Sequence, residues 1–363
     1  MSSYDAILFV SFGGPEGPDD VMPFLRNVLR GKNVPEARMK EVAHHYDLFE
    51  GVSPINGQNR ALIAALEAEL KERAIDLPIY WGNRNWHPML ADTLKQMQQD
   101  GIKKALAFVT SAYSSYSGCR QYLEDIIKAK EESQVDIEVD KLRVFYNHPL
   151  FIEANSQHVL AGLNQFQSQR ADTAIAFTAH SIPNAMADTC AYAAQLAEAC
   201  QLVADNVGHQ NYKLVYQSRS GPPTQPWLEP DICDHIRDLH SRGINNVLVH
   251  PIGFISDHME IVYDLDTEAS ALAAELGMKF VRTATAGTNI LFRKLMGDLV
   301  VERLKSNSGV DAERPALGSC GPAPDCCSPS CCAYTPMRPA QAAGAGTASG
   351  APGADSGSKR PTK

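Results

Sequence analysis

Residues 174–183, with the sequence AIAFTAHSIP, join an unbroken apolar run to an abrupt polar end. Such a run, without alternation, is typical of a strand that is buried on both faces of a parallel sheet. Pro183 favours an end to the strand because its nitrogen has no proton to donate. The stretch ILFVSFGGP at 7–15 has the same design. Each stretch therefore predicts a strand that delivers polar residues to one edge of a sheet.

Two further pairs of segments recur in the same order. YKLVYQSRSGPPTQPWLEP (212–230) resembles LPIYWGNRNWHP (77–88), and GINNVLVHPIGF (243–254) resembles GIKKALAFVTSAY (101–113). Amphipathic segments such as ALIAALEAELKER (61–73) lie between the apolar runs. The pattern predicts an α/β fold of two similar Rossmann-like lobes with parallel sheets around a shared cleft. The alternative, that all parallel-sheet units resemble one another, stays open on this evidence alone.

The composition changes along the chain. We expect residues 1–145 to form the first lobe, completed by a helix at about 289–306, and residues 146–288 to form the second. Residues 307–339 would be a Cys-rich tail. Residues 340–363 consist mainly of Ala, Gly, Ser and Pro. We expect them to be disordered because they offer little apolar surface to bury.

Charge and hydropathy restrict the function classes. The 363 residues carry a net charge of -9 and contain no block of Lys or Arg, so nucleic acid is not an expected partner. No apolar stretch approaches the roughly 18–20 residues that span a bilayer. Residues 1–5 lack the charged n-region of a secretory signal. We expect a cytoplasmic protein with at most peripheral membrane contact, and the oligomeric state is left open.

Two polar segments that follow predicted strands carry candidate catalytic residues. His180 ends the AIAFTAH run, and Glu260 lies after the strand that precedes PIGF. Ligands of open α/β sheets bind beyond the carboxyl ends of strands. Glu260, Asp264 and Glu268 have i, i+4, i+8 spacing and would share one helix face. That face is either a solvated acidic surface or a path for a divalent cation. A single histidine at a strand end is more often structural than catalytic.

Five segments in order resemble the ferrochelatase family. They are SFGGP (11–15), GVSPINGQNR (51–60), FTAHSIP (177–183), YQSRSGPPTQPWLEPDI (216–232) and PIGFISDHMEIVYDLDTE (251–268). YWGNRNWHP and SAYSSYSGC are similar to the actinobacterial-type bacterial members. One departure is Glu50, where the family often has a second glycine before Gly51. Neither a G-x-G-x-x-G nor a P-loop motif is present, so the fold class does not imply nucleotide binding.

The resemblance implies a lyase-class chelatase with a porphyrin cleft between the lobes. Ferrous iron would be inserted into protoporphyrin IX or coproporphyrin III with release of two protons, a terminal-stage step of haem biosynthesis. The actinobacterial-type likeness favours coproporphyrin III. The family's histidine and glutamate fall on His180 and Glu260, which would bind the iron and handle the protons. The resemblance leaves open which residue does which.

The resemblance also implies porphyrin contacts. Ser53 and Tyr122 match bacterial positions near the macrocycle, and Tyr46 and Phe12 match less closely. An aromatic face suits a flat ring, although a plain core role suits these residues as well. Arg30 could pair with a propionate, or could simply be a solvated residue on a helix.

Five of the nine cysteines lie between residues 320 and 332. Some ferrochelatases hold a [2Fe-2S] cluster with a C-terminal cysteine group and one cysteine of the body, and such a cluster needs four thiolates. The tail pattern C-x5-C-C-x3-C-C differs from the animal pattern C-x2-C-x4-C. A zinc site and a mobile redox tail are the competing interpretations. The expected ligands are Cys119, Cys320, Cys327 and Cys332, with Cys326 and Cys331 as alternates.

Two other functions compete with iron insertion. A chelatase for cobalt or nickel would share the fold, but the QSRSGPPTQPWLEP and DHMEIVYDLD segments favour the ferrous enzyme. A non-catalytic carrier of haem or porphyrin would not need both His180 and Glu260, and the chain retains both.

Overall fold

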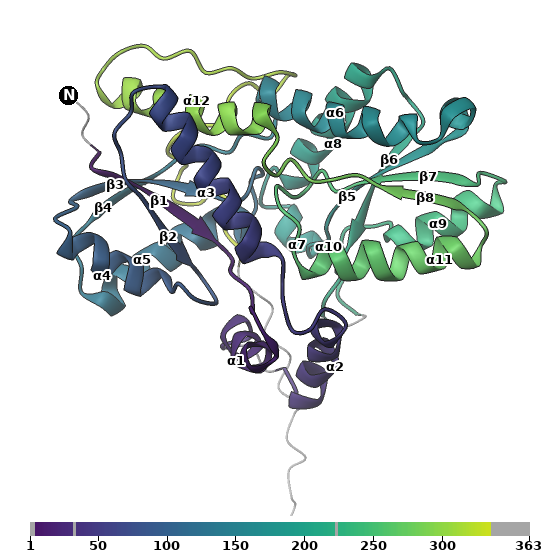
Figure 1. Ribbon diagram of the computed structural model, residues 1–363, viewed down its shortest axis with the longest axis horizontal. Helices are drawn as coiled ribbons and strands as arrows, with labels where there is room; N and C mark the ends of the chain where they lie inside the picture. Colours follow the sequence, from purple (N-terminus) through teal and green to yellow (C-terminus); the bar gives the residue numbers. More distant parts are fainter. Residues whose placement is uncertain (1–3, 32–33, 222–223, 335–363) are drawn as a thin grey trace, which may run out of the picture. The chain divides into compact units, whose positions relative to one another are not determined.

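The computed structural model describes residues 4–31, 34–221 and 224–334, and its strands form two parallel sheets (Figure 1). The first sheet has the order β2-β1-β3-β4. The second has the equivalent order β6-β5-β7-β8. All pairs in both sheets are parallel. The strands are β1 (Ala6–Ser11), β2 (Ile79–Asn83), β3 (Lys104–Val109), β4 (Glu138–Lys141), β5 (Ala174–His180), β6 (Tyr212–Gln217), β7 (Asn246–His250) and β8 (Lys279–Arg282).

This arrangement confirms the predicted α/β class with two similar parallel sheets. All of β1 is buried, and β5 is buried up to Ala179, after which His180 emerges half-exposed. Helices on both faces explain this burial. In Figure 1, α3 and α12 lie opposite α4 and α5 across the first sheet, and α6 and α8 lie opposite α9 and α11 across the second. The unbroken apolar runs are thus the signature of strands covered from both sides.

The helices vary in length and type. The α-helices are α1 (Pro18–Val28), α2 (Glu36–Asp47), α3 (Ile55–Glu72), α4 (Leu90–Gln99), α5 (Gln121–Ser133), α6 (Pro149–Asn164), α7 (Asn184–Ala187), α8 (Tyr192–Val207), α9 (Ile232–Ser241), α10 (Met259–Tyr263), α11 (Ser270–Glu275) and α12 (Ile290–Asn307). Two π-helices, η1 (Tyr116–Arg120) and η3 (Asp264–Ala269), and a 3-10 helix, η2 (Gln167–Asp172), complete the set in the described residues. π-helical turns are rare and often mark functional sites.

Helix α3 begins six residues before the amphipathic segment that the sequence suggests. Its first turns carry Asn56 and Asn59, both fully buried. Asn56 donates to the carbonyl of Gly14 at 3.1 Å, and Asn59 donates to the hydroxyl of Ser11 at 2.9 Å. The start of α3 therefore does not follow an amphipathic pattern, because its two asparagines are buried and hydrogen-bond to the end of β1 and to the loop after it.

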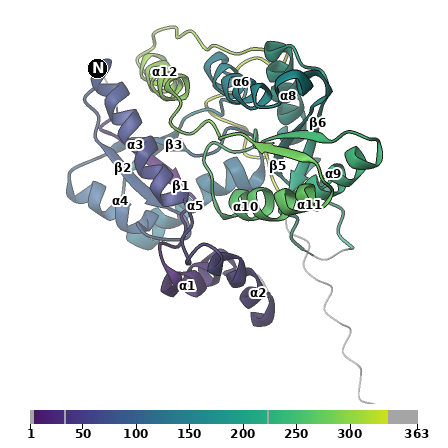
Figure 2. The ribbon, with the colours of Figure 1, turned by 45° about the vertical axis from the view of Figure 1, so that its right-hand side comes forward.

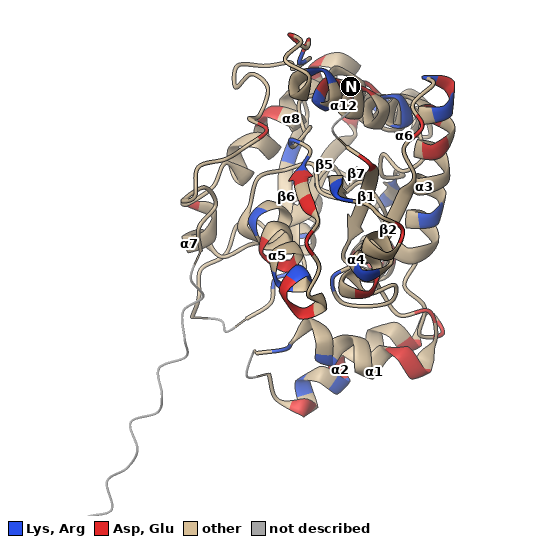
Figure 3. Cartoon of the chain, turned by 90° about the vertical axis from the view of Figure 1, so that its left-hand side faces the viewer, with Lys and Arg blue, Asp and Glu red and all other residues tan. Residues whose placement is uncertain are grey.

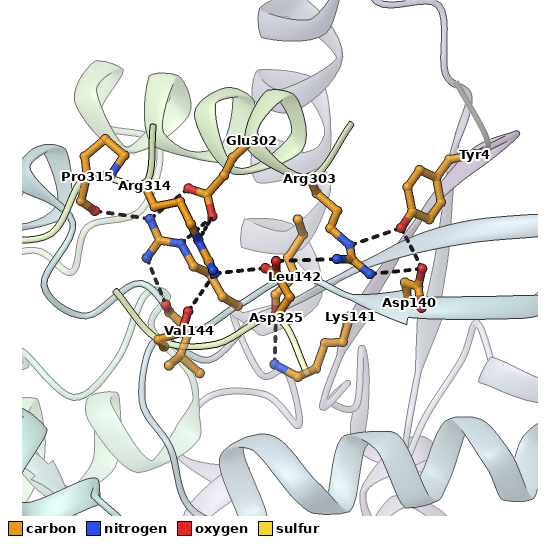
Figure 4. Close-up of polar contacts among 12 residues, drawn as sticks. Tyr4, Asp140, Lys141, Leu142, Val144, Glu302, Arg303, Arg314, Pro315 and Asp325 are labelled. Carbon is orange, nitrogen blue, oxygen red and sulfur yellow. Dashed lines mark hydrogen bonds and ion pairs between the residues drawn. The ribbon is translucent and has the colours of Figure 1, made fainter. Parts of the chain in front are cut away.

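The C-terminal segment is tied to the body by charges (Figure 4). Arg143 and Glu302 form a buried two-pronged ion pair, with N–O distances of 2.7 and 3.0 Å. Arg314 joins Glu302 at 3.1 Å and Asp325 at 3.1 Å, and Arg143 also donates to the carbonyl of Pro315. Helix α12 is thus linked to the segment after β4 and to the described part of the tail. The disorder expected for residues 340–363 concerns residues outside the described ranges.

Helix α12 packs against both α3 and α6, and Figure 2 shows it beside these two helices. In the view of Figure 3, Lys and Arg residues are interspersed with Asp and Glu residues along the helices. None of the helices in the described residues combines the length and apolar character needed to cross a membrane.

Candidate active site

His180 stands at the carboxyl end of β5, where the strand leaves the buried sheet. Its Nδ1 lies 2.5 Å from the backbone carbonyl of Ser181, which can only accept, so Nδ1 carries a proton. The Tyr192 hydroxyl donates to the carbonyl of His180 at 3.0 Å. The Ser181 contact orients the ring and leaves Nε2 as the atom that faces the site, while Tyr192 holds the backbone of His180.

Glu260 approaches that free nitrogen from another element. It is the second residue of α10, and its Oε1 lies 3.3 Å from Nε2 of His180. Its Oε2 lies 3.5 Å from Nδ1 of His258, the residue that caps the helix. Gln217, at the end of β6, donates to the backbone carbonyl of Glu260 at 2.8 Å. The structure therefore brings the two predicted catalytic residues together and adds His258 and Gln217, which sequence reasoning did not single out although both lie within the quoted motifs.

The histidine and the glutamate form an ion pair. Burial lowers the pKa of His180, but the Glu260 carboxylate outweighs this effect and the pKa rises to about 9. Burial raises the pKa of Glu260, but His180 and then His258 outweigh it and the pKa falls to about 2. Opposite charges in contact favour both charged forms. At neutral pH the pair is imidazolium and carboxylate, with side chains that are 32% and 47% exposed.

Two more carboxyl groups continue from Glu260 along the π-helix η3. Burial, together with the charges of Glu260 and Glu268, raises the pKa of Asp264 to about 7, although the Ser218 hydroxyl donates to its carboxylate. Burial and the charge of Asp231 raise the pKa of Glu268. We call Glu260, Asp264 and Glu268 the acidic row. Asp266, between them in sequence, pairs instead with Arg282.

An aromatic cluster lies beside α10. Phe24 of α1 packs against Phe12 and Tyr46, with ring centroids 6.2 and 6.1 Å apart. Met259, the neighbour of Glu260, belongs to the same apolar cluster. Burial and then the charge of Glu260 raise the pKa of Tyr46. Two of the predicted porphyrin contacts, Phe12 and Tyr46, therefore lie on the Glu260 side of the fold.

The other predicted contacts lie farther along the first lobe. Ser53 is buried, and a side chain at Gly14 would collide with it, so it packs beneath the SFGGP loop. Tyr122 is buried in the core of the first sheet, with the guanidinium of Arg84 4.4 Å above its ring. Arg84 also lies 5.7 Å from the ring of Phe12, a link that no motif indicated. Arg30 donates to Asn27 at 2.7 Å on the surface.

Glu50, the predicted departure from the family pattern, has a left-handed backbone with φ of 54°. Gly51 follows with φ of 74°. A side chain in this region costs about 1–2 kcal/mol, so a second glycine would relieve strain in the loop that leads to Ser53.

Several cysteines gather beside η1. The buried Cys119 of η1 interacts with the thiols of Cys327 and Cys332. Cys331 hydrogen-bonds with Cys327, and its Sγ lies 3.5 Å from that of Cys332. Burial, followed by the neighbouring thiols, raises the pKa of Cys327 to about 11. Arg120 of η1 holds the tail here by donating to the carbonyl of Cys331 at 3.1 Å.

Cys320 has different neighbours. Its thiol hydrogen-bonds with Tyr146 and with Glu198, and the Tyr146 hydroxyl donates to Glu198 at 2.7 Å. Cys326 is exposed. Among the residues that the structure describes, no three His, Cys, Asp or Glu side chains are placed to hold a metal ion together.

Comparison with known proteins decides the family. The ferrochelatase family model matches residues 4–304. This chain belongs to the ferrochelatase family. It is 55% identical over 346 residues to the ferrochelatase of Rhodopirellula baltica, covering 95% of this chain and 97% of that protein. It is 49% identical over 359 residues to the coproporphyrin III ferrochelatase of Streptomyces griseus, covering 93% and 96%.

The predicted function is therefore confirmed. The chain is a lyase-class metal chelatase whose substrates are iron and a porphyrin, in haem biosynthesis. Its fold is similar to that of SirB from Bacillus subtilis with Fe3+, with a TM-score of 0.50 at 11% identity, covering 85% of this chain and 99% of the other. A surface hollow of about 530 Å³, lined by residues such as Pro149, Glu153 and Leu317, does not include the His180–Glu260 pair.

Proposed function

We propose that this ferrochelatase inserts ferrous iron into coproporphyrin III and releases two pyrrole protons. The relatives from Streptomyces griseus and Streptomyces coelicolor are coproporphyrin III ferrochelatases, each 49% identical to this chain. The observation that carries the proposed site is the 3.3 Å contact between His180 and Glu260 at the end of β5. Protoporphyrin IX is the competing substrate.

The test is an anaerobic assay in which Fe(II) is supplied with each porphyrin and the Soret and visible bands are followed. We expect a higher kcat/KM for coproporphyrin III, and an equal or higher value for protoporphyrin IX contradicts the substrate assignment. His180→Ala should abolish insertion and leave porphyrin binding largely intact. His44→Ala is the matched control, because His44 is exposed on α2 and contacts Asp47 of its own helix. Near-normal turnover by His180→Ala contradicts the site assignment.

The charge state of the pair suggests a division of labour. Glu260 is ionised and offers a hard oxygen ligand that suits ferrous iron. A dication bound there adds positive charge beside the His180 imidazolium and lowers its pKa. The resulting neutral imidazole, held through Nδ1 by Ser181, presents Nε2 to accept a pyrrole proton. We therefore assign iron binding to Glu260 and proton transfer to His180.

The acidic row gives ferrous iron a route to the His180–Glu260 pair and gives protons a route away from it. Asp264, with a pKa raised to about 7 chiefly by burial, can gain and lose a proton near neutral pH. Glu268 is exposed and interacts with Asp264, so it is the outer end of the row. Asp266 is excluded because Arg282 neutralises it. Asp264→Asn should slow insertion more than Asp266→Asn, and the reverse order argues against the route.

The porphyrin is assigned to the aromatic cluster beside α10. Phe12, which is half-buried, offers an apolar face at the edge of a cluster in which Tyr46 and Met259 are buried, and a bent macrocycle bound there would present its nitrogens to the pair. Ser53 and Tyr122, which are buried farther along the first lobe, remain proposed porphyrin contacts. Phe12→Ala should weaken porphyrin binding measured by fluorescence. An unchanged affinity removes Phe12 from the set.

We also propose that the cysteine tail holds a [2Fe-2S] cluster. Cys119 interacts with the thiols of Cys327 and Cys332, and four soft thiolates are the donor set that such a cluster takes. The position of Cys331 between the last two favours it over Cys320, which lies beside Glu198. When bound, the cluster would supply a cross-link between tail and body, and it takes no part in the insertion step.

Iron and acid-labile sulfide analysis with visible spectra tests this proposal. Protein prepared anaerobically with ample iron should contain two of each per chain, and Cys119→Ser should lose both. A comparison of the iron and sulfide contents of Cys331→Ser and Cys320→Ser decides which cysteine is the fourth ligand. A colourless protein that contains zinc would exclude the cluster. The predicted cytoplasmic location is kept as a proposal, and cell fractionation tests it.

A further inference from the structure

A ring stack joins α2 to α10. The imidazole of His45 lies on the ring of Tyr263 with centroids 3.7 Å apart and planes only 5° from parallel. His45 belongs to α2, and Tyr263 ends the helix that carries Glu260. Both side chains are half-buried. Burial, then Arg38 and His44, lower the pKa of His45, so at neutral pH the stack is formed by two uncharged rings.

The stack lies over an apolar contact between the same elements. Tyr46, next to His45, and Met259, next to Glu260, belong to one buried cluster, and Val262 packs against it. A further contact nearby joins α3 to the segment just before α10. The backbone N–H of Asp257, just before α10, donates to the side chain of Gln58 on α3 at 2.7 Å. Helix α2 thus closes over α10 through apolar packing and the ring stack.

Tyr263 has a second partner. Its hydroxyl hydrogen-bonds with the carboxylate of Glu268, the outer member of the acidic row. One ring therefore touches α2 with its face and the acidic row with its edge. A displacement of α2 that broke the stack would also release the side chain that holds Glu268.

We propose that the His45–Tyr263 stack is a latch that holds α2 closed over α10 and sets the position of Glu268 through Tyr263. His45 is then a positioning residue, since it acts through Tyr263 and not on the reacting atoms. The aromatic cluster assigned to the porphyrin includes Tyr46 of α2, so the macrocycle leaves when the latch opens. The part of the inference that concerns porphyrin rests on the proposed place of the macrocycle, and the part that concerns iron rests on the proposed role of the acidic row.

The first test measures porphyrin release from the full chain without iron, by stopped-flow fluorescence. Aromatic pairs contribute about 0.5–1.5 kcal/mol beyond their burial, so His45→Ala should speed release about 2- to 13-fold. His44→Ala is the control on the same helix and should release porphyrin at the wild-type rate, because that side chain is 83% exposed. His45→Phe keeps an aromatic face and should restore slow release. Equal release rates for His45→Ala and His44→Ala would overturn the latch.

The second test separates the latch from the acidic row. Tyr263→Phe keeps the stack but removes the hydroxyl, so it should raise the KM for Fe(II) and leave porphyrin release unchanged. Tyr263→Ala should change both. Fast porphyrin release from Tyr263→Phe refutes the stack as the latch. If Glu268→Gln and Tyr263→Phe both leave the KM for Fe(II) unchanged while His45→Ala still speeds release, the iron route fails and the latch stands.

Discussion

Replacing Glu260 by glutamine should change the charge of His180 without moving it far. The carboxylate, 3.3 Å from Nε2, is the main reason that the pKa of His180 rises from 6.5 to about 9. Without that charge, burial lowers the pKa, while the Ser181 carbonyl and Asp264 still raise it. We therefore expect the pKa of His180 to fall well below 9. A fall as far as the ordinary 6.5 would lower the protonated fraction of His180 at pH 7.5 from about 97% to about 9%.

The assay is a titration of the imidazole signals by NMR, with His180→Gln used to assign the resonance. Asp266→Asn is the matched control, because this carboxylate pairs with Arg282 rather than with a histidine. It should leave the pKa of His180 near 9. A pKa that stays above 8 in Glu260→Gln refutes the argument that the ion pair sets the charge of the histidine.

Two further predictions concern stability. Glu302→Gln leaves the buried Arg143 without its charged partner and should cost about 3–5 kcal/mol in urea unfolding. Arg38→Met, which breaks an exposed pair, should cost under about 1 kcal/mol, and equal losses would contradict the difference in burial. Because its pKa is raised on folding, His180 contributes stability that is fully present below about pH 6.5. This contribution is lost as the pH rises through about 9. Because its pKa is lowered on folding, Glu260 contributes stability that is present above about pH 4.5 and is lost as the pH falls through about 2. The wild type should therefore exceed Glu260→Gln in free energy of unfolding most between pH 4.5 and 6.5. A stability advantage that is undiminished at pH 10 would contradict this.

Local sequence determined the fold class because a strand that is buried on both faces is an unbroken apolar run. AIAFTAH became β5, and the equivalent run at 7–11 lies in β1, each an inner strand of its sheet. The same pattern placed His180 at a strand end, since the apolar run stops where the sheet leaves its cover. The polar start of α3 was missed because buried asparagines do not follow amphipathic periodicity.

The candidate site needed the tertiary structure. Glu260 follows a different strand from His180, and the turn into α10 brings their side chains together. The stack of His45 on Tyr263 depends on how α2 packs over α10, and nothing in either segment alone indicates it. Side chains far apart in sequence meet only through the packing of whole elements, which the local pattern does not encode. The strands could therefore be predicted from local sequence, whereas the partners of His180 and His45 depend on the tertiary fold.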